Sequence, residues 1–129
     1  MQTSPPVTLT APAERSSVRL VRILAAGLAA DAGLNIDETE DLRIAVSELV
    51  ALLVDGSGDG APTIEVEFRR GDGEVVVEGR CTSAAGRAAA TEVDDLVLEI
   101  LRVVVDDHMF DTDDAGRRFR LVKRARVAS

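Results

Sequence analysis

The stretch DETEDLRIAVSELVALLV, residues 37–54, has the pattern of one long helix. Four carboxylates crowd its first turn, where the positive end of a helix dipole favours negative charge. Apolar residues then recur every three or four positions, which is the spacing of a helix with one face against a core. We therefore expect a helix that begins at Asn35 or Asp37 and ends near Val54.

Two strands are expected directly after this helix. Residues 55–60, DGSGDG, have the composition of a loop. Residues 63–70 then alternate apolar and charged side chains at period two, which is typical of a half-buried strand. Residues 71–73, GDG, favour a tight turn into residues 74–78, whose three consecutive valines indicate a buried strand. The two strands are expected to pair as a hairpin.

The rest of the chain extends this pattern on both sides. The expected elements are a short edge strand at Val7–Leu9, a helix capped by Ser16 or Ser17 and ending at Gly33, a loop or weak helix over residues 79–90, a helix capped by Thr91 and running to about Asp107, a strand from Met109, a turn over residues 113–116 and a strand at Arg117–Lys123. Helices interspersed with antiparallel hairpins predict an α/β (α+β) two-layer sandwich, with a mixed, mostly antiparallel sheet and helices on one face.

The length of 129 residues corresponds to one domain. The polar, proline-bearing residues 1–6 are expected to be disordered, residues 7–126 to form the single domain and residues 127–129 to be a tail. With 46% hydrophobic and 29% charged residues, the chain can build an ordinary core, which excludes the disordered, collagen-like and low-complexity classes.

Charge and cysteine content limit the partners and the compartment. Fifteen basic against twenty-three acidic residues give a net charge of -8, which opposes attraction to phosphate backbones, so nucleic acid is not an expected partner. Charges interrupt the apolar stretches well before the roughly 20 residues that cross a bilayer, so no membrane partner is expected. The single cysteine, Cys81, cannot form an internal disulfide, and the N-terminus lacks a signal-peptide pattern. These features predict a cytoplasmic protein.

Glu48 is the position of clearest chemical interest. Its neighbours three and four residues away along the helix, Ile44, Ala45, Ala51 and Leu52, are all apolar. A carboxylate on or beside an apolar stripe costs free energy unless an interaction compensates for it. One interpretation is a carboxylate held in a pocket, where it acts as a general base. The alternative is that Glu48 lies at the margin of the stripe and reaches water.

Residues 37–48, DETEDLRIAVSE, resemble the helix that carries the nucleotide-site motif of the anti-sigma factor serine kinases. These proteins are small bacterial members of the GHKL (histidine kinase-like, Bergerat-fold) ATPases and are commonly dimeric. The order of the expected elements agrees with that family over nearly the whole chain. The resemblance implies a histidine kinase-like ATPase fold, Mg-ATP as cofactor, and a sigma factor or an anti-anti-sigma protein as partner. It also implies that Glu48 matches the general base that activates the serine of the anti-anti-sigma protein.

The other nucleotide-site positions depart from the family. Leu52 stands where the family has an Asn that ligates the magnesium of ATP, and leucine offers no oxygen ligand. Gly79 and Cys81 stand at the Asp and the Gly of the motif that recognises adenine. Residues 94–97, DDLV, replace a glycine-rich lid, and their two carboxylates would repel phosphate. We therefore expect a degenerate site with no cofactor, in which Glu48 is vestigial.

The expected function is that of a pseudo-kinase: a protein-binding regulator that resembles an anti-sigma factor and neither binds nor hydrolyses ATP. Partners in the family use the face near the lid and the first helix, which makes Arg15, Arg19 and Arg22 candidate partner contacts. Their spacing alone would indicate a solvated helix face.

Two alternatives stay open. One is an active ATP-dependent anti-sigma factor serine kinase that uses Glu48 as base, with substitute ligands from the acidic residues. The other is a homodimerisation or scaffold module, in which the edge strand at Val7–Leu9 and the apolar first helix pair across a two-fold axis.

Overall fold

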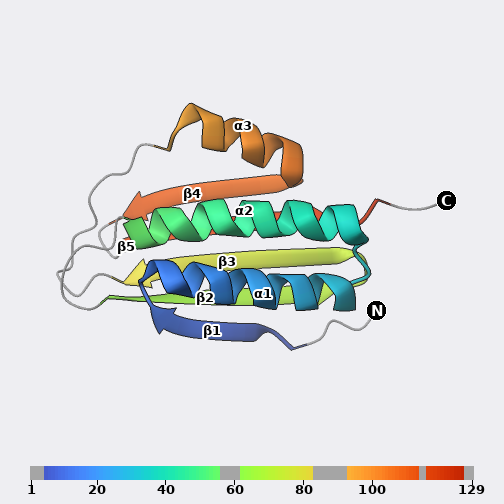
Figure 1. Cartoon of the computed structure of the whole chain (residues 1–129), viewed down its shortest axis with the longest axis horizontal. Helices are drawn as coiled ribbons and strands as arrows, with labels where there is room; N and C mark the ends of the chain where they lie inside the picture. Colours follow the sequence, from blue (N-terminus) through green and yellow to red (C-terminus); the bar gives the residue numbers. More distant parts are fainter. Residues whose placement is uncertain (1–4, 56–61, 83–92, 114–115, 127–129) are drawn as a thin grey trace.

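The computed structural model describes residues 5–55, 62–82, 93–113 and 116–126; residues 1–4, with most of the predicted disordered start, and the predicted tail 127–129 fall outside these ranges. The described residues form five strands and three helices (Figure 1). In chain order the elements are β1 (Val7–Pro12), α1 (Arg15–Asp31), α2 (Ile36–Asp55), β2 (Thr63–Gly71), β3 (Glu74–Thr82), α3 (Asp95–Val104), β4 (Asp107–Asp113) and β5 (Gly116–Arg124). No helix in this described part of the chain is long and apolar enough to cross a membrane.

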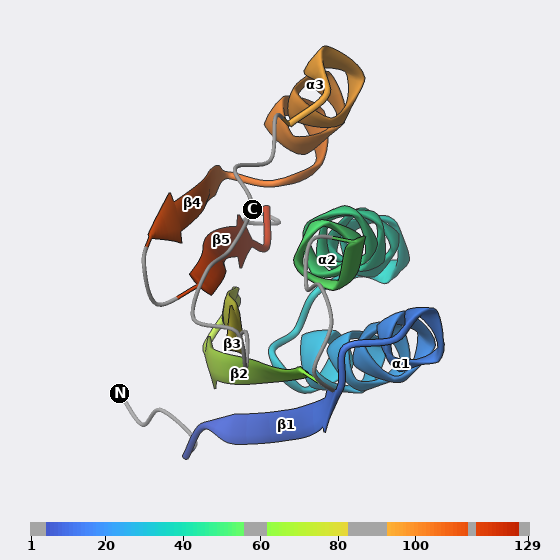
Figure 2. The same ribbon diagram turned by 90° about the vertical axis from the view of Figure 1, so that its left-hand side faces the viewer.

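The strands form one sheet in the order β1-β2-β3-β5-β4, and every neighbouring pair is antiparallel. The three helices lie on the same face of this sheet, so the molecule has two layers (Figure 2). α2 lies between the other two helices, with α1 on the side of β1 and α3 on the side of β4 (Figure 2). The predicted two-layer α+β sandwich is therefore confirmed.

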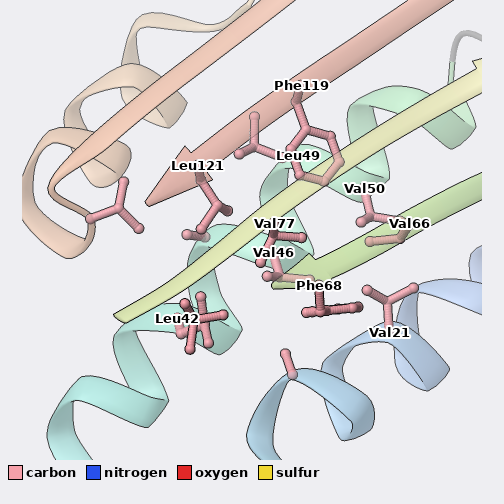
Figure 3. Close-up of a cluster of buried hydrophobic side chains, with 14 of the residues drawn as sticks. Val21, Leu42, Val46, Leu49, Val50, Val66, Phe68, Val77, Phe119 and Leu121 are labelled. Atoms are coloured by element: carbon pink, nitrogen blue, oxygen red, sulfur yellow. The ribbon is translucent and has the colours of Figure 1, made fainter. Parts of the chain in front are cut away.

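The core lies between the two layers because the strands turn alternate side chains toward the helices. On β2, Ile64, Val66 and Phe68 are fully buried, whereas the residues between them are charged and more exposed. Leu42 and Leu49 of α2 are fully buried in the same apolar cluster (Figure 3). The period-two pattern of the sequence therefore predicted the buried face of β2 correctly.

The start of α2 is fixed by a reciprocal capping box. The side-chain oxygen Oδ1 of Asn35 accepts a hydrogen bond from the backbone N–H of Glu38 at 2.8 Å, and Oε1 of Glu38 accepts one from the backbone N–H of Asn35 at 2.8 Å. The other carboxylate oxygen of Glu38 accepts from the backbone N–H of Arg126, just after β5. The hydrogen bonds from Arg126 and then from Asn35 lower the pKa of Glu38. Asn35 therefore caps the helix, which confirms one of the two predicted starts.

α1 begins earlier than predicted. Its first helical residue is Arg15, and the backbone oxygen of Glu14 accepts a hydrogen bond from the backbone N–H of Ser17 at 3.0 Å. Ser16 and Ser17 lie inside the helix, so the prediction that one of them caps it is wrong. Backbone groups of the segment after β1 satisfy the helix start, and no side chain caps it in the described structure.

α3 is shorter than predicted at both ends. Its cap is Asp94, whose carboxylate accepts a hydrogen bond from the backbone N–H of Leu96 at 2.9 Å, whereas the predicted cap Thr91 lies outside the described residues. The helix ends at Val104 and not near Asp107, because Asp107 already pairs with β5 as the first residue of β4.

The limits of three strands also differ from the predicted ones, because pairing between strands decides where each strand begins and ends. β1 continues to Pro12 because all six of its residues pair with β2. β3 continues to Thr82, into the stretch 79–90 that we predicted as a loop or weak helix, because it is flanked by both β2 and β5. The rest of that stretch lies outside the described residues. β4 begins at Asp107, two residues before the predicted Met109.

Candidate functional site

An open groove of about 230 Å³ lies between α1 and α2 on the outer side of the helical layer. It brings together two of the residues that the sequence singled out, Glu48 on α2 and Arg22 on α1. The residues that line the groove are Arg22, Glu40, Arg43, Ile44, Ser47 and Glu48. The groove is therefore lined both by Glu48, which matches the family motif, and by Arg22, one of the three arginines expected to contact a partner.

Glu48 lies at the margin of the buried face of α2. Leu42, Val46 and Leu49 are fully buried, and Glu48 comes one position before Leu49, which rotates it by about 100° around the helix. Its side chain is half-buried. Within the part of the chain that the structure describes, its carboxylate makes no hydrogen bond or ion pair. Glu48 therefore lies at the margin of the apolar stripe, as the alternative interpretation had it. Its carboxylate remains available to a molecule in the groove.

Two arginines bring hydrogen-bond donors without partners to the same groove. The Nε atoms of Arg22 and Arg43 are both buried, and neither has a hydrogen-bond partner in the described structure. A buried donor left without a partner costs about 1–3 kcal/mol. Because both Nε atoms are buried, an acceptor in the groove reaches them only after the arginine side chains move.

Neighbouring contacts hold Arg43 in place. Its Nη1 atom is 3.0 Å from Oε2 of Glu40, one turn earlier on α2. The hydroxyl of Ser47 donates a hydrogen bond to the backbone oxygen of Arg43 at 2.7 Å. The sequence analysis did not identify Arg43 as a site residue, although its place four residues before Ser47 puts both on one side of the helix.

Arg15 and Arg19, the other two candidate contacts, lie outside the groove. Arg15 forms an ion pair with Asp55 at the end of α2, with 3.2 Å between Nη2 and Oδ1, and both side chains are largely exposed. Such exposed pairs contribute about 0–1 kcal/mol. Arg19 is exposed and has no ion pair in the described part of the chain. Of the three arginines, Arg22 lines the groove together with Glu48, whereas Arg15 and Arg19 lie on α1 outside the groove.

The positions that the resemblance assigns to the nucleotide are Leu52, one turn after Glu48 on α2, and Gly79 and Cys81 on β3. The side chain of Leu52 packs against the core. Gly79 lies against the ring of Phe119, its partner across β3 and β5. A Cβ atom on Gly79 would come within 2.3 Å of Cε2 of Phe119, so no side chain fits there without moving the ring. Cys81 is buried, and burial raises the pKa of its thiol.

These residues do not fit a magnesium-bound nucleotide. Leu52 and Gly79 offer no carboxylate or amide oxygen on a side chain. Asp94 and Asp95, at the positions of the family's lid, lie at the start of α3, where Asp94 caps the helix. The stretch 83–92 lies outside the described residues.

Comparison with known proteins gives one informative result. No family model matches the sequence, and no curated protein matches it. Among solved structures, the chain is similar to the crystal structure of the RsbU and RsbW domains of Rv1364c from Mycobacterium tuberculosis, with 19% identity and a TM-score of 0.70. The match covers 98% of this chain and 35% of that chain, so this chain spans about a third of the other's length. The likeness shows the fold, and it confirms the fold class that the resemblance implied.

Proposed function

We propose that this chain is a cytoplasmic protein-binding regulator of the anti-sigma factor kind, and that it works as a pseudo-kinase without nucleotide. The observation that carries the proposal is the pair of buried Nε–H donors of Arg22 and Arg43 beside the carboxylate of Glu48. The structural likeness to a chain that contains an RsbW domain supports it.

The groove fits a polar segment of a partner protein. Its two unpartnered Nε–H groups need oxygen acceptors, whereas the carboxylate of Glu48 needs a donor. A serine or threonine hydroxyl can accept from Arg22 and donate to Glu48 at the same time. We therefore place the hydroxyl-bearing segment of an anti-anti-sigma protein, or a polar segment of a sigma factor, in this groove, with Arg15 and Arg19 at its rim.

Two packed side chains, Leu52 and Phe119, support the proposal that the chain has no nucleotide step. Leu52 supplies no magnesium ligand, and the ring of Phe119 takes the space that an adenine-binding carboxylate at position 79 would need. Glu48 then serves as a hydrogen-bond acceptor for the partner and no longer as a base.

Binding to a purified partner tests this proposal. The sigma factor or anti-anti-sigma protein that co-purifies with the chain from its source cell is identified, purified and titrated with the chain in a calorimeter. Arg22→Ala is expected to weaken binding about 10- to 100-fold, because it removes the cation that α1 contributes to the groove. Arg102→Ala is the matched control, since Arg102 is an exposed arginine on α3 that pairs with Glu99. Recovery of neither partner type contradicts the proposal.

An active serine kinase is the alternative, and it draws on the same placement of Glu48 at the groove. It requires transfer of phosphate from ATP to the purified partner, with loss of transfer in a Glu48→Gln variant. Transfer that depends on Glu48 would replace the pseudo-kinase proposal, whereas binding without transfer supports it.

A further inference from the structure

The face of the sheet opposite the helices is hollowed at its centre. No described helix lies on this face (Figure 2). Residues of β2, β3, β5 and β4 line an open hollow of about 390 Å³, which is larger than the groove between α1 and α2. Its charged lining residues are four arginines and three glutamates, whereas the whole chain has 15 basic and 23 acidic residues. The hollow is therefore less acidic than the chain as a whole.

Three of these arginines lie next to one another on the neighbouring strands β3 and β5. Arg80 of β3 is directly opposite Arg118 of β5 in the antiparallel pairing, and Arg120 follows two positions later on β5. Opposite residues on one face of a sheet have Cβ atoms about 4.5–5.5 Å apart, and diagonal neighbours are about 7–8 Å apart. All three side chains are exposed, and we name them the arginine triad.

The triad places like charges side by side, which is unfavourable for the chain alone. Two of its members turn to acidic partners on the outer sides of their strands. Nη2 of Arg80 is 2.8 Å from Oε1 of Glu65 on β2, and Nη2 of Arg118 is 3.1 Å from Oδ2 of Asp111 on β4. Such exposed pairs contribute little to stability, so an acidic group of another molecule can compete for both arginines.

Arg120 is the member of the triad without an acidic partner. Glu78 is directly opposite on β3, but no ion pair or hydrogen bond joins their side chains in the described structure. The charge of Glu78 acts on Arg69 of β2, whose pKa is raised first by its hydrogen bond to Glu67, then by the charge of Glu67 and in part by that of Glu78. The guanidinium of Arg120 therefore keeps its N–H donors for a molecule in the hollow.

An exposed apolar side chain lies beside Arg120. Met109 of β4 is directly opposite Arg120 on the side away from Glu78, and it is 42% exposed. Methionine and arginine are both enriched in the centres of protein–protein interfaces. Arginine binds a carboxylate through two parallel hydrogen bonds, and methionine adapts to a neighbouring apolar surface. A carboxylate on an apolar stem satisfies both residues, whereas an inorganic anion satisfies only the arginine.

We propose that the arginine triad and Met109 bind an acidic, extended segment of a partner protein. A glutamate of the segment approaches Arg120 over Met109, away from Glu78, with its methylene groups on Met109. A second glutamate two positions along an extended chain lies about 7 Å away on the same side, which is the spacing between Arg120 and Arg118. Its carboxylate binds between the opposite guanidiniums of Arg80 and Arg118 and offsets their repulsion.

The proposal does not rest on the proposed function. The triad lies on the open face of the sheet, whereas the groove with Arg22 and Glu48 lies on the outer side of the helical layer (Figure 2). Nucleic acid does not fit the same hollow, because its phosphates repeat along the whole backbone and would also meet the three glutamates.

Binding of a synthetic peptide tests the proposal. The probe is a blocked peptide with two glutamates two positions apart among valines and threonines, and the control peptide has lysine in place of both glutamates. Each is titrated into the full chain, with the amide and arginine Nε–H signals followed by nuclear magnetic resonance. The signals of Arg118 and Arg120 are expected to shift in a saturable way with the glutamate peptide and to stay unchanged with the lysine peptide.

Arg120→Gln separates binding from folding. The variant is expected to weaken binding of the glutamate peptide about tenfold, because it removes the unpaired guanidinium. Its melting temperature is expected to stay within about 3 °C of the wild type, because no ion pair is lost in the described structure. Arg102→Gln is the matched control, since Arg102 is an exposed arginine on α3 that pairs with Glu99.

Three results would overturn the proposal. One is the absence of saturable shifts at the triad with the glutamate peptide. Another is equal binding of this peptide by Arg120→Gln and Arg102→Gln. The third is inorganic phosphate that produces the same shifts with the same affinity as the peptide, which would indicate a simple anion site. Because Arg22 lies in the helical layer, none of these results affects the partner groove, and failure of the groove leaves the triad untouched.

Discussion

The two sides of α2 are filled in different ways. Toward α1, the helix borders an open groove in which Arg22 and Arg43 have buried donors without partners in the described structure. One turn after Glu48, Leu52 packs against the core, as does Phe119 of β5, at and beside the positions that the resemblance assigns to the nucleotide. Under the proposed function, the groove is the part of α2 that binds a partner, while the residues packed in the core contribute to stability.

Buried contacts hold the packed side together. The Nζ atom of Lys123 on β5 donates a hydrogen bond to the backbone oxygen of Val104 at 2.9 Å and lies 3.4 Å from Oδ2 of Asp41 on α2. Nη1 of Arg117 is 3.5 Å from the backbone oxygen of Leu52. One strand thus connects both α2 and the end of α3 to the sheet.

The largest expected effect comes from restoring the carboxylate of the family at position 79. Gly79→Asp places a side chain against the ring of Phe119 and buries a charge, so we expect a loss of about 3 kcal/mol or more in the free energy of unfolding. Urea unfolding measures it, with Glu78→Asp as the exposed control on the same strand. An unchanged midpoint for Gly79→Asp would show that the packed side can accept a ligand-binding group.

Lys123→Met is expected to have the next largest effect. The substitution keeps the apolar stem but removes the donor to Val104 and the cation beside Asp41, so we expect a loss of about 1–3 kcal/mol. Arg118→Met is the control, because Arg118 forms an exposed pair with Asp111. Equal stability of the two variants would mean that Lys123 does not hold the packed side together.

The hydrogen bonds of Glu38 at the start of α2 predict that the free energy of unfolding depends on pH. Hydrogen bonds from Arg126 and Asn35 lower the pKa of Glu38 below its ordinary value of 4.5. The ionised carboxylate therefore stabilises the fold above pH 4.5, and this contribution is lost as the pH falls through the lowered pKa of the folded state. Glu38→Gln is expected to be less stable than the wild type at neutral pH and to approach it in acid. A constant difference in unfolding free energy between the two across this range would contradict the assignment.

The smallest effect on stability is expected on the open side. Arg22→Ala should lower the free energy of unfolding by no more than about 0.5 kcal/mol, because its Nε atom has no hydrogen bond to lose in the described structure and removal of this buried donor offsets the lost packing of the half-buried stem. Chemical denaturation checks this value beside the partner titration. A large loss of stability would show that Arg22 is a structural residue, and the contrast between the two sides of α2 would fail.

Much of the fold could be predicted because apolar residues alternate with charged ones along β2 and recur every three or four positions along α2. Ile64, Val66 and Phe68 gave the buried face of β2, and the first-turn carboxylates together with Asn35 gave the start of α2. The start of α1 could not be predicted, because a backbone group of Glu14 closes its first turn and no side-chain pattern records that. The extent of β3 to Thr82 depends on strands on both of its sides, which only the tertiary structure reveals.

The candidate site was predicted in part. The apolar neighbours of Glu48 and the family motif singled out that residue. Arg22 was a candidate only through the resemblance, because partners in that family use the first helix, whereas the spacing of the α1 arginines alone indicated a solvated face. That these two meet in one groove depends on how α1 packs on α2, which periodicity does not fix. Arg43 was missed because an arginine on a polar helix face looks like a solvated residue until the burial of its Nε atom is known. A side chain at position 79 would collide with the ring of Phe119, which lies on the neighbouring strand β5. The sequence of β3 alone therefore could not reveal this obstruction.

The most direct test of the central claim is thermal unfolding of the purified chain with and without magnesium and saturating ATP or ADP, with magnesium alone as the control. A ligand that binds only the folded state stabilises it by about 2.7 kcal/mol at 100 times its dissociation constant. For a domain of this size that corresponds to a rise in melting temperature on the order of 5 °C. We predict no rise, because packed side chains occupy the nucleotide positions. A rise of that size would contradict the claim that the chain acts by binding proteins without nucleotide.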